Sequence, residues 1–238
     1  MRDVSYIPWG DEDYLVIAVD NAGGIGEKEQ DVVHVPYETV AYYTTRVAMM
    51  ECMAVGARPT AIIMQNLTSD EAYSAFEKGI RNICKEMKQE DVYISGSSES
   101  NIPVVQTCLG ITVIGNVKKK ERKVACTPRD AKFAVIGVPL VGEEVVLQQE
   151  KVLPLSLFKE VLKGNGVYEV VPVGSKGVRY EVEQLLQAND VAYTNIQSDI
   201  NITASSGPAT CVVISYHNEY EQAIHVMCGE HFHPLTVE

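Results

Sequence analysis

The sequence predicts an α+β protein of two domains, and three observations support that prediction. Apolar segments of strand length alternate irregularly with helical segments in both halves of the chain. The 238 residues suffice for two modest domains. A basic, polar stretch (KKKERK, then CTPRD) interrupts the pattern near the middle. We therefore expect an N-terminal domain over residues 1–127 and a C-terminal domain over residues 128–238.

The N-terminal half opens on a buried strand followed by a long helix. Residues 14–20 (YLVIAVD) are apolar and β-prone, and a glycine-rich turn ends this strand. Pro36 fits the first turn of a helix that runs to about Val55, and Gly56 fits its end. The further elements expected in this half are strands at 31–35, 60–66, 91–95 and 104–117, and a helix from Asp70 to about Met87 that Ser69 caps.

The C-terminal half shows the same mixture of elements. Val178, Val182, Leu185 and Leu186 fall at i, i+4, i+7 and i+8, which indicates one apolar face of a helix. The other elements expected here are strands at 131–139, 167–173 and 209–216, helices at 154–162 and near 218–225, and a short terminal strand.

Composition narrows the class of protein. The formal net charge of −12 argues against a nucleic-acid partner, because phosphate backbones are bound with Lys and Arg. No apolar run reaches the ~20 residues of a membrane helix, and the chain does not begin with a basic-then-apolar signal region. Six widely spaced cysteines without a CxxC pair are typical of buried free thiols. We expect a cytoplasmic protein.

The most informative local pattern begins with Asp20, which stands at the end of the first strand, before the turn that carries Gly24, Gly26 and Lys28. An ionised carboxylate there needs hydrogen-bond donors or a cation. The turn lacks both the GxxxxGK[ST] and the GxGxxG spacing, so on its own it is more typical of a flexible turn than of a phosphate-binding loop. An acid that merely caps the turn is the alternative.

Two further acids occupy positions that suit a binding site. Glu51 lies in VAMMECMAVG, where its neighbours are apolar, and we expect an inward, paired carboxylate rather than a side chain turned to solvent. Glu99 lies in SGSSESN directly after a predicted strand, beside Ser97 and Ser98. This segment is either a ligand-binding loop or a hydrophilic connector.

Two other clusters give weaker signals. Asp11, Glu12 and Asp13 precede the first strand, and this pattern favours a solvated edge over a contribution to a second metal site. Near the end of the chain, Cys228, His231 and His233 include zinc-ligand types without an evident fourth ligand. The nucleophile signatures GxSxG and HExxH are absent.

Taken together, these residues resemble a known superfamily: aminoimidazole ribonucleotide (AIR) synthetase, thiamine-monophosphate kinase, selenophosphate synthetase and the hydrogenase-maturation dehydratase. The segment VAMMECMAVGARPTAII is similar to that family's helix, in which an Asp precedes GA-x-P by the same spacing. SGSSESN and LGITVIGNV are similar to its Gly-Gly-(Asp/Glu)-Thr loop and following strand. The chain departs in having Glu51 for Asp and Ser97-Ser98 for the glycine pair, and it is about a third shorter.

The resemblance implies a two-domain AIR-synthase-like fold with an α+β N-terminal domain and an α/β C-terminal domain. It implies a homodimer formed by pairing of the N-terminal sheets, with ATP bound at that interface. By residue matching, Asp20, Glu51 and Glu99 would hold Mg²⁺, which suits three mutually repelling carboxylates. Gly24, Gly26 and Lys28, with Ser97 and Ser98, would line the nucleotide site.

For function, the resemblance implies an ATP- and Mg²⁺-dependent kinase for the hydroxymethyl group of a small nucleoside-like substrate. In overall size the chain is similar to one short relative, the α-ribazole kinase of cobalamin salvage. This similarity makes α-ribazole the leading candidate for the phosphate acceptor. The alternatives are an AIR-synthetase-like cyclo-ligase that activates an amide with ATP, and a non-catalytic nucleotide-binding protein. No general base is evident from the sequence.

Overall fold

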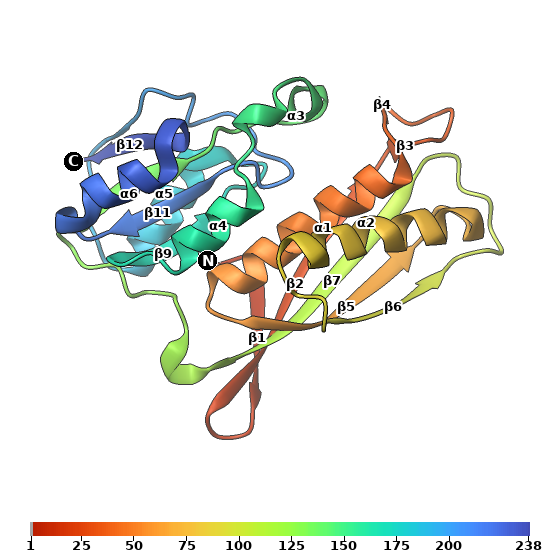
Figure 1. The fold of residues 1–238 in the computed structure, drawn as a ribbon, viewed down its shortest axis with the longest axis horizontal. Coiled ribbons are helices and arrows are strands. Elements are labelled where there is room, and N and C mark those ends of the chain that lie inside the picture. Colours follow the sequence, from red (N-terminus) through yellow and green to blue (C-terminus); the bar gives the residue numbers. More distant parts are fainter. Residues whose placement is uncertain (1) are drawn as a thin grey trace. The chain divides into compact units, whose positions relative to one another are not determined.

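The computed structural model describes residues 2–238 and divides the chain into two compact units (Figure 1). The N-terminal unit is Asp3–Arg122, and the C-terminal unit contains Arg2 and Lys123–Glu238. The division between residues 122 and 123 lies within the basic stretch, whereas the sequence placed it between 127 and 128.

The N-terminal unit is a five-stranded sheet with two main helices. Its strands are β1 (Val4–Trp9), β2 (Asp13–Gly23), β3 (Ile25–Gly26), β4 (Val33–His34), β5 (Arg58–Asn66), β6 (Tyr93–Ser98) and β7 (Cys108–Lys118). Its helices are α1 (Tyr37–Ala54) and α2 (Tyr73–Glu86), with 3₁₀ turns at Asp70–Ala72 and Lys119–Glu121. The sheet order is β1-β2-β7-β5-β6, and β3 pairs separately with β4. Within the five-stranded sheet, β5 and β6 run parallel and the other neighbours are antiparallel.

Helix α1 packs along β2 and β7, and α2 packs against α1 (Figure 1). Most of the apolar run at the end of α1 is buried, and Met49, Met50 and Cys52 face the core. The contact with the sheet is close: a Cβ built on Gly115 of β7 would lie 2.6 Å from the Cys52 sulfur. Helix α2 is amphipathic and buries Phe76, Ile80 and Ile83, as its sequence pattern predicts.

The opposite face of this sheet has no helix from the described part of its own unit. Alternation along β2 sends Val16 and Ala18 toward α1 and Ile17 and Val19 to the other face. Val19 is 59% exposed on that face. By pairing register, the apolar side chains that share the open face are Ile7, Trp9, Leu15, Ile63, Tyr93 and Ile114. A partly exposed apolar sheet face of this kind is a feature of interaction surfaces.

The C-terminal unit is a second five-stranded sheet of order β10-β12-β8-β11-β9. Its strands are β8 (Lys132–Ile136), β9 (Val167–Pro172), β10 (Ile196–Gln197), β11 (Val212–Tyr216) and β12 (Phe232–Val237). Its helices are α3 (Glu143–Leu147), α4 (Leu155–Leu162), α5 (Gly177–Ala188) and α6 (Glu221–Cys228), with 3₁₀ turns at Gln149–Lys151, Asn218–Tyr220 and Gly229–His231. The predicted apolar face of α5 is confirmed, because its four residues share one core with Val135 and Val213 of the sheet.

A buried carboxylate explains why the C-terminal unit begins before residue 128. Glu169 of β9 is 2% exposed and accepts hydrogen bonds from the main-chain N–H groups of Ala125 and Cys126, both at 3.1 Å. It also accepts from the Thr127 hydroxyl at 2.8 Å and the Asn189 amide at 2.8 Å. Three of these four donors belong to residues 125–127, so the carboxylate attaches this segment to the C-terminal sheet.

Most predicted helices and strands are confirmed, and the differences have local causes. The sequence analysis expected no element before residue 14, yet Val4–Trp9 forms the edge strand β1. The strand expected at 104–117 begins at Cys108, because Val104 and Thr107 bond to neighbouring loops instead. Ser69 precedes the 3₁₀ turn, but its hydroxyl makes no capping hydrogen bond. Among residues 2–238, no helix combines the length and the apolarity that crossing a bilayer requires.

The close packing of α2 on α1 gives a stability prediction. A Cβ on Gly79 of α2 would lie 2.9 Å from the Tyr42 main-chain nitrogen and closer still to the Glu38 carbonyl oxygen. An exposed helical Gly→Ala change normally gains up to ~1 kcal/mol. We expect Gly79→Ala to cost about 1–3 kcal/mol instead, because backbone atoms of α1 must move. Urea unfolding measures it, with Ser74→Ala on the same helix as the control; a stabilised Gly79→Ala would contradict the packing.

Candidate functional site

Four strand ends converge at one end of the N-terminal sheet. Pairing register sets Asn66 of β5 beside Ser98 of β6 and beside Leu109 of β7, and sets Gly23 of β2 beside Cys108 of β7. The segments that follow these ends contain Gly24, Gly26, Lys28 and Glu99, and Ser97 and Ser98 are the last two residues of β6. We call this region the loop end of the sheet.

The glycine-rich turn is held against the segment that precedes β7. The Gly24 N–H donates to the Thr107 carbonyl at 2.9 Å, and Gly24 has a φ of +71°, a conformation that favours glycine. A Cβ on Gly26 would lie 2.8 Å from the Cβ and Cγ2 of Thr107 and closer still to its hydroxyl. Both glycines therefore permit a close approach of the turn to the chain's own Thr107.

Asp31 holds this turn in place from beneath. It is 6% exposed, and its carboxylate accepts from the Thr107 hydroxyl at 2.6 Å, the Thr107 N–H at 2.8 Å and the Lys28 N–H at 2.9 Å. Burial raises the pKa of Asp31, but these hydrogen bonds together outweigh burial and hold the pKa below its ordinary value. The carboxylate is thus ionised and fully used inside the protein.

A second buried network joins the ends of β5, β6 and β7. The Asn66 side-chain amide donates to the Ser98 hydroxyl at 2.9 Å and to the Ser69 carbonyl at 2.6 Å. Its carbonyl oxygen accepts from the Thr68 N–H at 2.9 Å. The Thr68 hydroxyl donates to the Cys108 carbonyl at 2.9 Å and accepts from the Cys108 N–H at 3.0 Å. These bonds give the loop end a defined shape.

Lys28 lies half-buried between three loops. Its ammonium group donates to the Thr68 carbonyl at 2.8 Å and to the Val104 carbonyl. Its main-chain N–H is the one held by Asp31. The predicted phosphate-contacting lysine thus lies at the loop end and binds main-chain oxygens of the protein.

Asp20 lies on the helix-facing side of β2, in register with Ile111 of β7. Burial raises the pKa of Asp20 to about 7, and a hydrogen bond from the Asn21 main chain offsets part of that rise. The side chain is therefore a carboxylate with little charge compensation from the protein, which is the environment that a bound cation would relieve.

Glu99 follows β6, and its backbone N–H donates to the Asn66 carbonyl at 2.8 Å. One carboxylate oxygen accepts from the N–H groups of Asn101 at 2.7 Å and Ile102 at 3.3 Å. Those backbone hydrogen bonds lower the pKa of Glu99. Ser97 is exposed, and Ser98 is half-buried against Asn66. Glu99 is thus an ionised acid at the rim of the loop end.

Glu51 is buried, with 8% of its surface exposed, so the outward alternative is excluded. Its position along the sheet differs from that of Asp20. Cys52 lies against Gly115, which pairs with Val16, and Asp20 is about 13 Å further along β2 at ~3.3 Å per residue. Within residues 2–238 there is no group of three or more His, Cys, Asp or Glu side chains placed to hold a metal ion.

The two weaker clusters are also placed by the structure. Cys228 is buried, and His233 faces Asp199 with a 3.4 Å separation between Nδ1 and Oδ1. Burial lowers the pKa of His231. Asp11 lies at the turn between β1 and β2, where its carbonyl accepts from the Lys119 ammonium at 2.5 Å. This turn lies at the opposite end of the sheet from the loop end.

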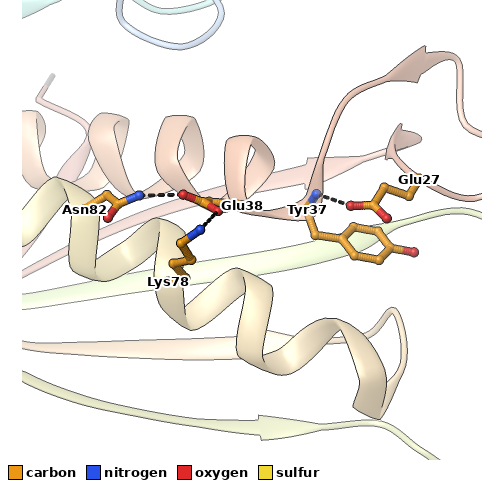
Figure 2. A network of polar contacts seen from close by, with 5 residues as sticks. All are labelled: Glu27, Tyr37, Glu38, Lys78 and Asn82. Carbon is orange, nitrogen blue, oxygen red and sulfur yellow. Dashed lines mark hydrogen bonds and ion pairs between the residues drawn. The ribbon is translucent and has the colours of Figure 1, made fainter.

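The start of α1 is tied to the turn and to α2, as Figure 2 shows. The Glu27 carboxylate accepts from the Tyr37 N–H at 2.8 Å, which satisfies one free donor of the first helical turn. The next residue of the same first turn, Glu38, accepts from the Lys78 ammonium at 2.7 Å and from the Asn82 amide at 2.7 Å, both on α2. The glycine-rich turn therefore leads into a helix whose first residues are fixed.

The sequence analysis missed several residues that shape the loop end: Asp31, Asn66, Thr68 and Thr107. Each is buried although its side chain is polar. Polar residues directly flanking apolar strands were an available signal, since such groups need partners when buried. The partners themselves are 76 residues apart in the case of Asp31 and Thr107, so no local pattern reveals them.

Comparison with known proteins gives a fold. No protein-family model matches the chain, and none of the curated proteins matches its sequence. Among solved structures, Thermotoga maritima PurL complexed with ADP is similar with a TM-score of 0.66 at 14% identity, over 100% of this chain and 42% of that chain. Thiamine-monophosphate kinase from Stenotrophomonas maltophilia K279a has a TM-score of 0.64 at 13% identity, over 98% of this chain and 89% of that chain. AaThiL complexed with AMPPCP and TMP has a TM-score of 0.63 at 12% identity, over 100% of this chain and 84% of that chain.

These likenesses show that the chain has the mixed α/β fold of PurL and ThiL, the AIR-synthase-like fold that the sequence resemblance implied. The match extends through both units, because it covers nearly all of this chain. The chain spans about two fifths of the PurL chain and most of each thiamine-monophosphate kinase chain.

Contact between Gly26 and Thr107 gives a second prediction. Gly26→Ala is expected to cost about 1–3 kcal/mol, because the added methyl group displaces Thr107 from Asp31. Gly23→Ala is the matched control, since a Cβ there meets nothing within 4 Å. Chemical denaturation of both variants measures the difference; equal stabilities would show that the turn does not rest on Thr107.

The environment of Asp20 gives a third prediction. Its pKa is about 7 in the folded protein and has the ordinary aspartate value of 3.8 in an unfolded chain, so the folded state loses stability as pH rises from about 4 to 7. Asp20→Asn removes that loss and is expected to raise the free energy of unfolding by about 1–3 kcal/mol at pH 8, with partial exposure taken into account. Urea unfolding at pH 4.5 and pH 8 tests this.

Asp31→Asn is the comparison variant, because its expected effect on the free energy of unfolding has the opposite sign to that of Asp20→Asn. The pKa of Asp31 is lowered, so its stabilising effect is present above the unfolded value and fades as pH falls through the folded value. Asp31→Asn should therefore destabilise the protein at neutral pH, with a smaller cost in acid. If Asp20→Asn and Asp31→Asn changed stability with the same pH dependence, the opposite pKa shifts of Asp20 and Asp31 would be ruled out.

Proposed function

We propose that this protein is an ATP-dependent phosphotransferase that uses the loop end of the N-terminal sheet to bind the nucleotide. The observation that carries the proposal is the match of nearly the whole chain to thiamine-monophosphate kinases, which are themselves matched over 84–89% of their length. One of those structures contains AMPPCP and TMP, and the similar PurL structures contain ADP or ATP.

In this proposal the nucleotide lies beside the glycine-rich turn and the end of β6. Gly24 and Gly26 let the turn approach closely, Lys28 lies among the same loops, and Ser97 and Ser98 offer hydroxyl groups from the adjacent strand. The ordered loops would hold ATP and its acceptor in line. Positioning and charge stabilisation then account for most of the rate, as is usual for phosphoryl transfer.

The acids fit a magnesium ion of the kind that accompanies ATP. Mg²⁺ in such sites is held by one or two carboxylates, phosphate oxygens and water rather than by an all-protein cage. Asp20 lacks a compensating charge, and Glu99 is ionised with one oxygen committed to backbone donors. When bound, Mg²⁺ would offset the charge that develops on the phosphates. Cys52, the neighbour of Glu51, packs on Gly115, whose partner Val16 lies four residues along β2 from Asp20, so we propose that Glu51 holds a separate metal ion.

For the acceptor we propose the hydroxymethyl group of a small nucleoside-like molecule, with α-ribazole as the first compound to test. The second candidate is an amide-activating cyclo-ligase, which the similarity to PurL favours. A binding protein without turnover is the third. Product analysis distinguishes the three functions. A kinase gives a phosphomonoester, a cyclo-ligase gives free phosphate and a product with a new ring, and a binding protein releases no ADP.

The open face of the N-terminal sheet supports the homodimer that the resemblance implied. Ile7, Trp9 and Tyr93 are 44%, 67% and 67% exposed on this face. Ile7 lies in register with Leu15 and Tyr93 with Ala61, so apolar side chains from both edges of the sheet share this face. We propose that a second copy covers it by pairing the same face around a two-fold axis.

The function is tested by ADP release with α-ribazole, thiamine phosphate or formylglycinamidine ribonucleotide, with and without Mg²⁺. We expect Mg²⁺-dependent release with one nucleoside-like alcohol and a phosphomonoester product. Glu99→Gln and Glu51→Gln should each lower kcat/KM at least tenfold, because each removes a charge assigned to metal binding. Unchanged turnover in Glu51→Gln would remove Glu51 from the metal assignment. Nucleotide binding without ADP release for all three compounds would favour the binding protein.

The dimer is tested by placing a charge at the centre of the open face. Val19→Lys is expected to shift the protein from dimer to monomer, because an ammonium group would be buried in an apolar interface. Val226→Lys, which changes a 72% exposed valine on α6, is the matched control. Light scattering coupled to size-exclusion chromatography measures the mass; a monomeric wild-type protein would refute the dimer.

A further inference from the structure

Lys28 joins three segments of the loop end that the sequence keeps far apart. Its ammonium group donates to the Thr68 carbonyl in the loop after β5, at 2.8 Å, and to the Val104 carbonyl in the loop before β7. Its main-chain N–H donates to Asp31, at 2.9 Å. One residue therefore connects the glycine-rich turn with both neighbouring loops, across 40 and 76 positions of sequence.

These contacts occupy most of the hydrogen-bond donors of the Lys28 ammonium group. An ammonium group has three N–H donors, and two of them are bound by main-chain carbonyls. The pKa of Glu71 is lowered first by its backbone and Ser69 hydrogen bonds, and also by the charge of Lys28. Since the group is half-buried among oxygen acceptors and near an acid, a phosphate oxygen would have to compete for it.

We propose that Lys28 is a positioning residue: it fixes the loops around the nucleotide site and acts on the nucleotide through them, not as a phosphate ligand. This inference rests on the proposed function for its effect on nucleotide binding. Its structural half stands without a ligand, because the bonds concern the protein alone. The loops that Lys28 fixes are residues 67–69 and 99–107, which include Glu99.

Peptide-resolved hydrogen exchange without nucleotide tests the structural half. Lys28→Met keeps the apolar stem and removes the ammonium donors, so we expect exchange in residues 67–69 and 99–107 to rise at least tenfold. The Lys28→Arg variant, which keeps charged donors, should retain most of the protection. Lys119→Met is the matched control, since Lys119 also binds a main-chain carbonyl, that of Asp11, at 2.5 Å but at the other end of the sheet. Unchanged exchange in Lys28→Met would overturn the proposal.

Affinities for AMP, ADP and AMPPCP with Mg²⁺ test the functional half. A positioning residue affects the whole site, so Lys28→Met should weaken all three nucleotides by a similar factor of about tenfold, with recovery in Lys28→Arg. A phosphate ligand would give a loss that grows from AMP to AMPPCP, and that result would overturn the proposal. If Lys28→Met does not fold, Lys28→Gln, which keeps an uncharged donor, takes its place in both experiments. A wild-type protein that binds none of the nucleotides would refute the proposed function, while the exchange data would still decide the loop contacts.

Discussion

The buried carboxylate of Asp31 is the constraint on which the loop end depends. Its three hydrogen bonds attach the glycine-rich turn to Thr107, which immediately precedes β7. These bonds stabilise the folded state because the Asp31 carboxylate is only 6% exposed. An ionised carboxylate buried to that extent without hydrogen-bond donors would be strongly destabilising. The lowered pKa of Asp31 expresses the same balance. The turn thus has one defined position relative to the central strands.

This position determines where α1 begins. The Val32 N–H donates to the Gly24 carbonyl at 2.7 Å, and the Val35 N–H donates to the Gly26 carbonyl at 3.1 Å, which folds the chain back toward the sheet. Pro36 and Tyr37 follow directly, and Glu27 binds the first free donor of the helix. Since α1 is a rigid helix packed on β2 and β7, fixing its start also fixes Glu51 near its end. A loop contact therefore sets the placement of a side chain several turns away.

The elements that the sequence predicts best are those whose signals are local. Helix α1 lies between a proline and a glycine and appears close to its predicted bounds. The strand predicted at 14–20 is confirmed as an apolar strand, but it continues to Gly23, so Asp20 lies within it rather than at its end. Strand β1 is different, because VSYIPW contains a proline and forms a strand only by pairing with β2 at the edge of the sheet. The early start of the C-terminal unit likewise depends on Glu169, whose partners are 42 to 44 residues away.

The candidate site divides in the same way. Asp20, Glu99 and the glycine-rich turn stand out because an acid or a glycine next to an apolar strand is visible in the sequence alone. Lys28 stands out too, but its ammonium group binds main-chain carbonyls. Every residue has such a carbonyl, so the sequence does not indicate which ones Lys28 binds. The placement of Cys52, the neighbour of Glu51, follows from its packing on Gly115, a contact between distant segments. Tertiary contacts thus decide what each candidate does.

The serine pair at the end of β6 shows how a departure from the resembling family fits this chain. Ser97 and Ser98 lie in a regular strand paired with Gln65 and Asn66, and neither has a positive φ, so glycine is not needed for the backbone. The Ser98 hydroxyl instead accepts from Asn66, which also holds Thr68 and Ser69. A glycine at 98 would leave that amide donor to find another acceptor. The Ser98 hydroxyl therefore orders the loop end, and Ser97 lies exposed beside it.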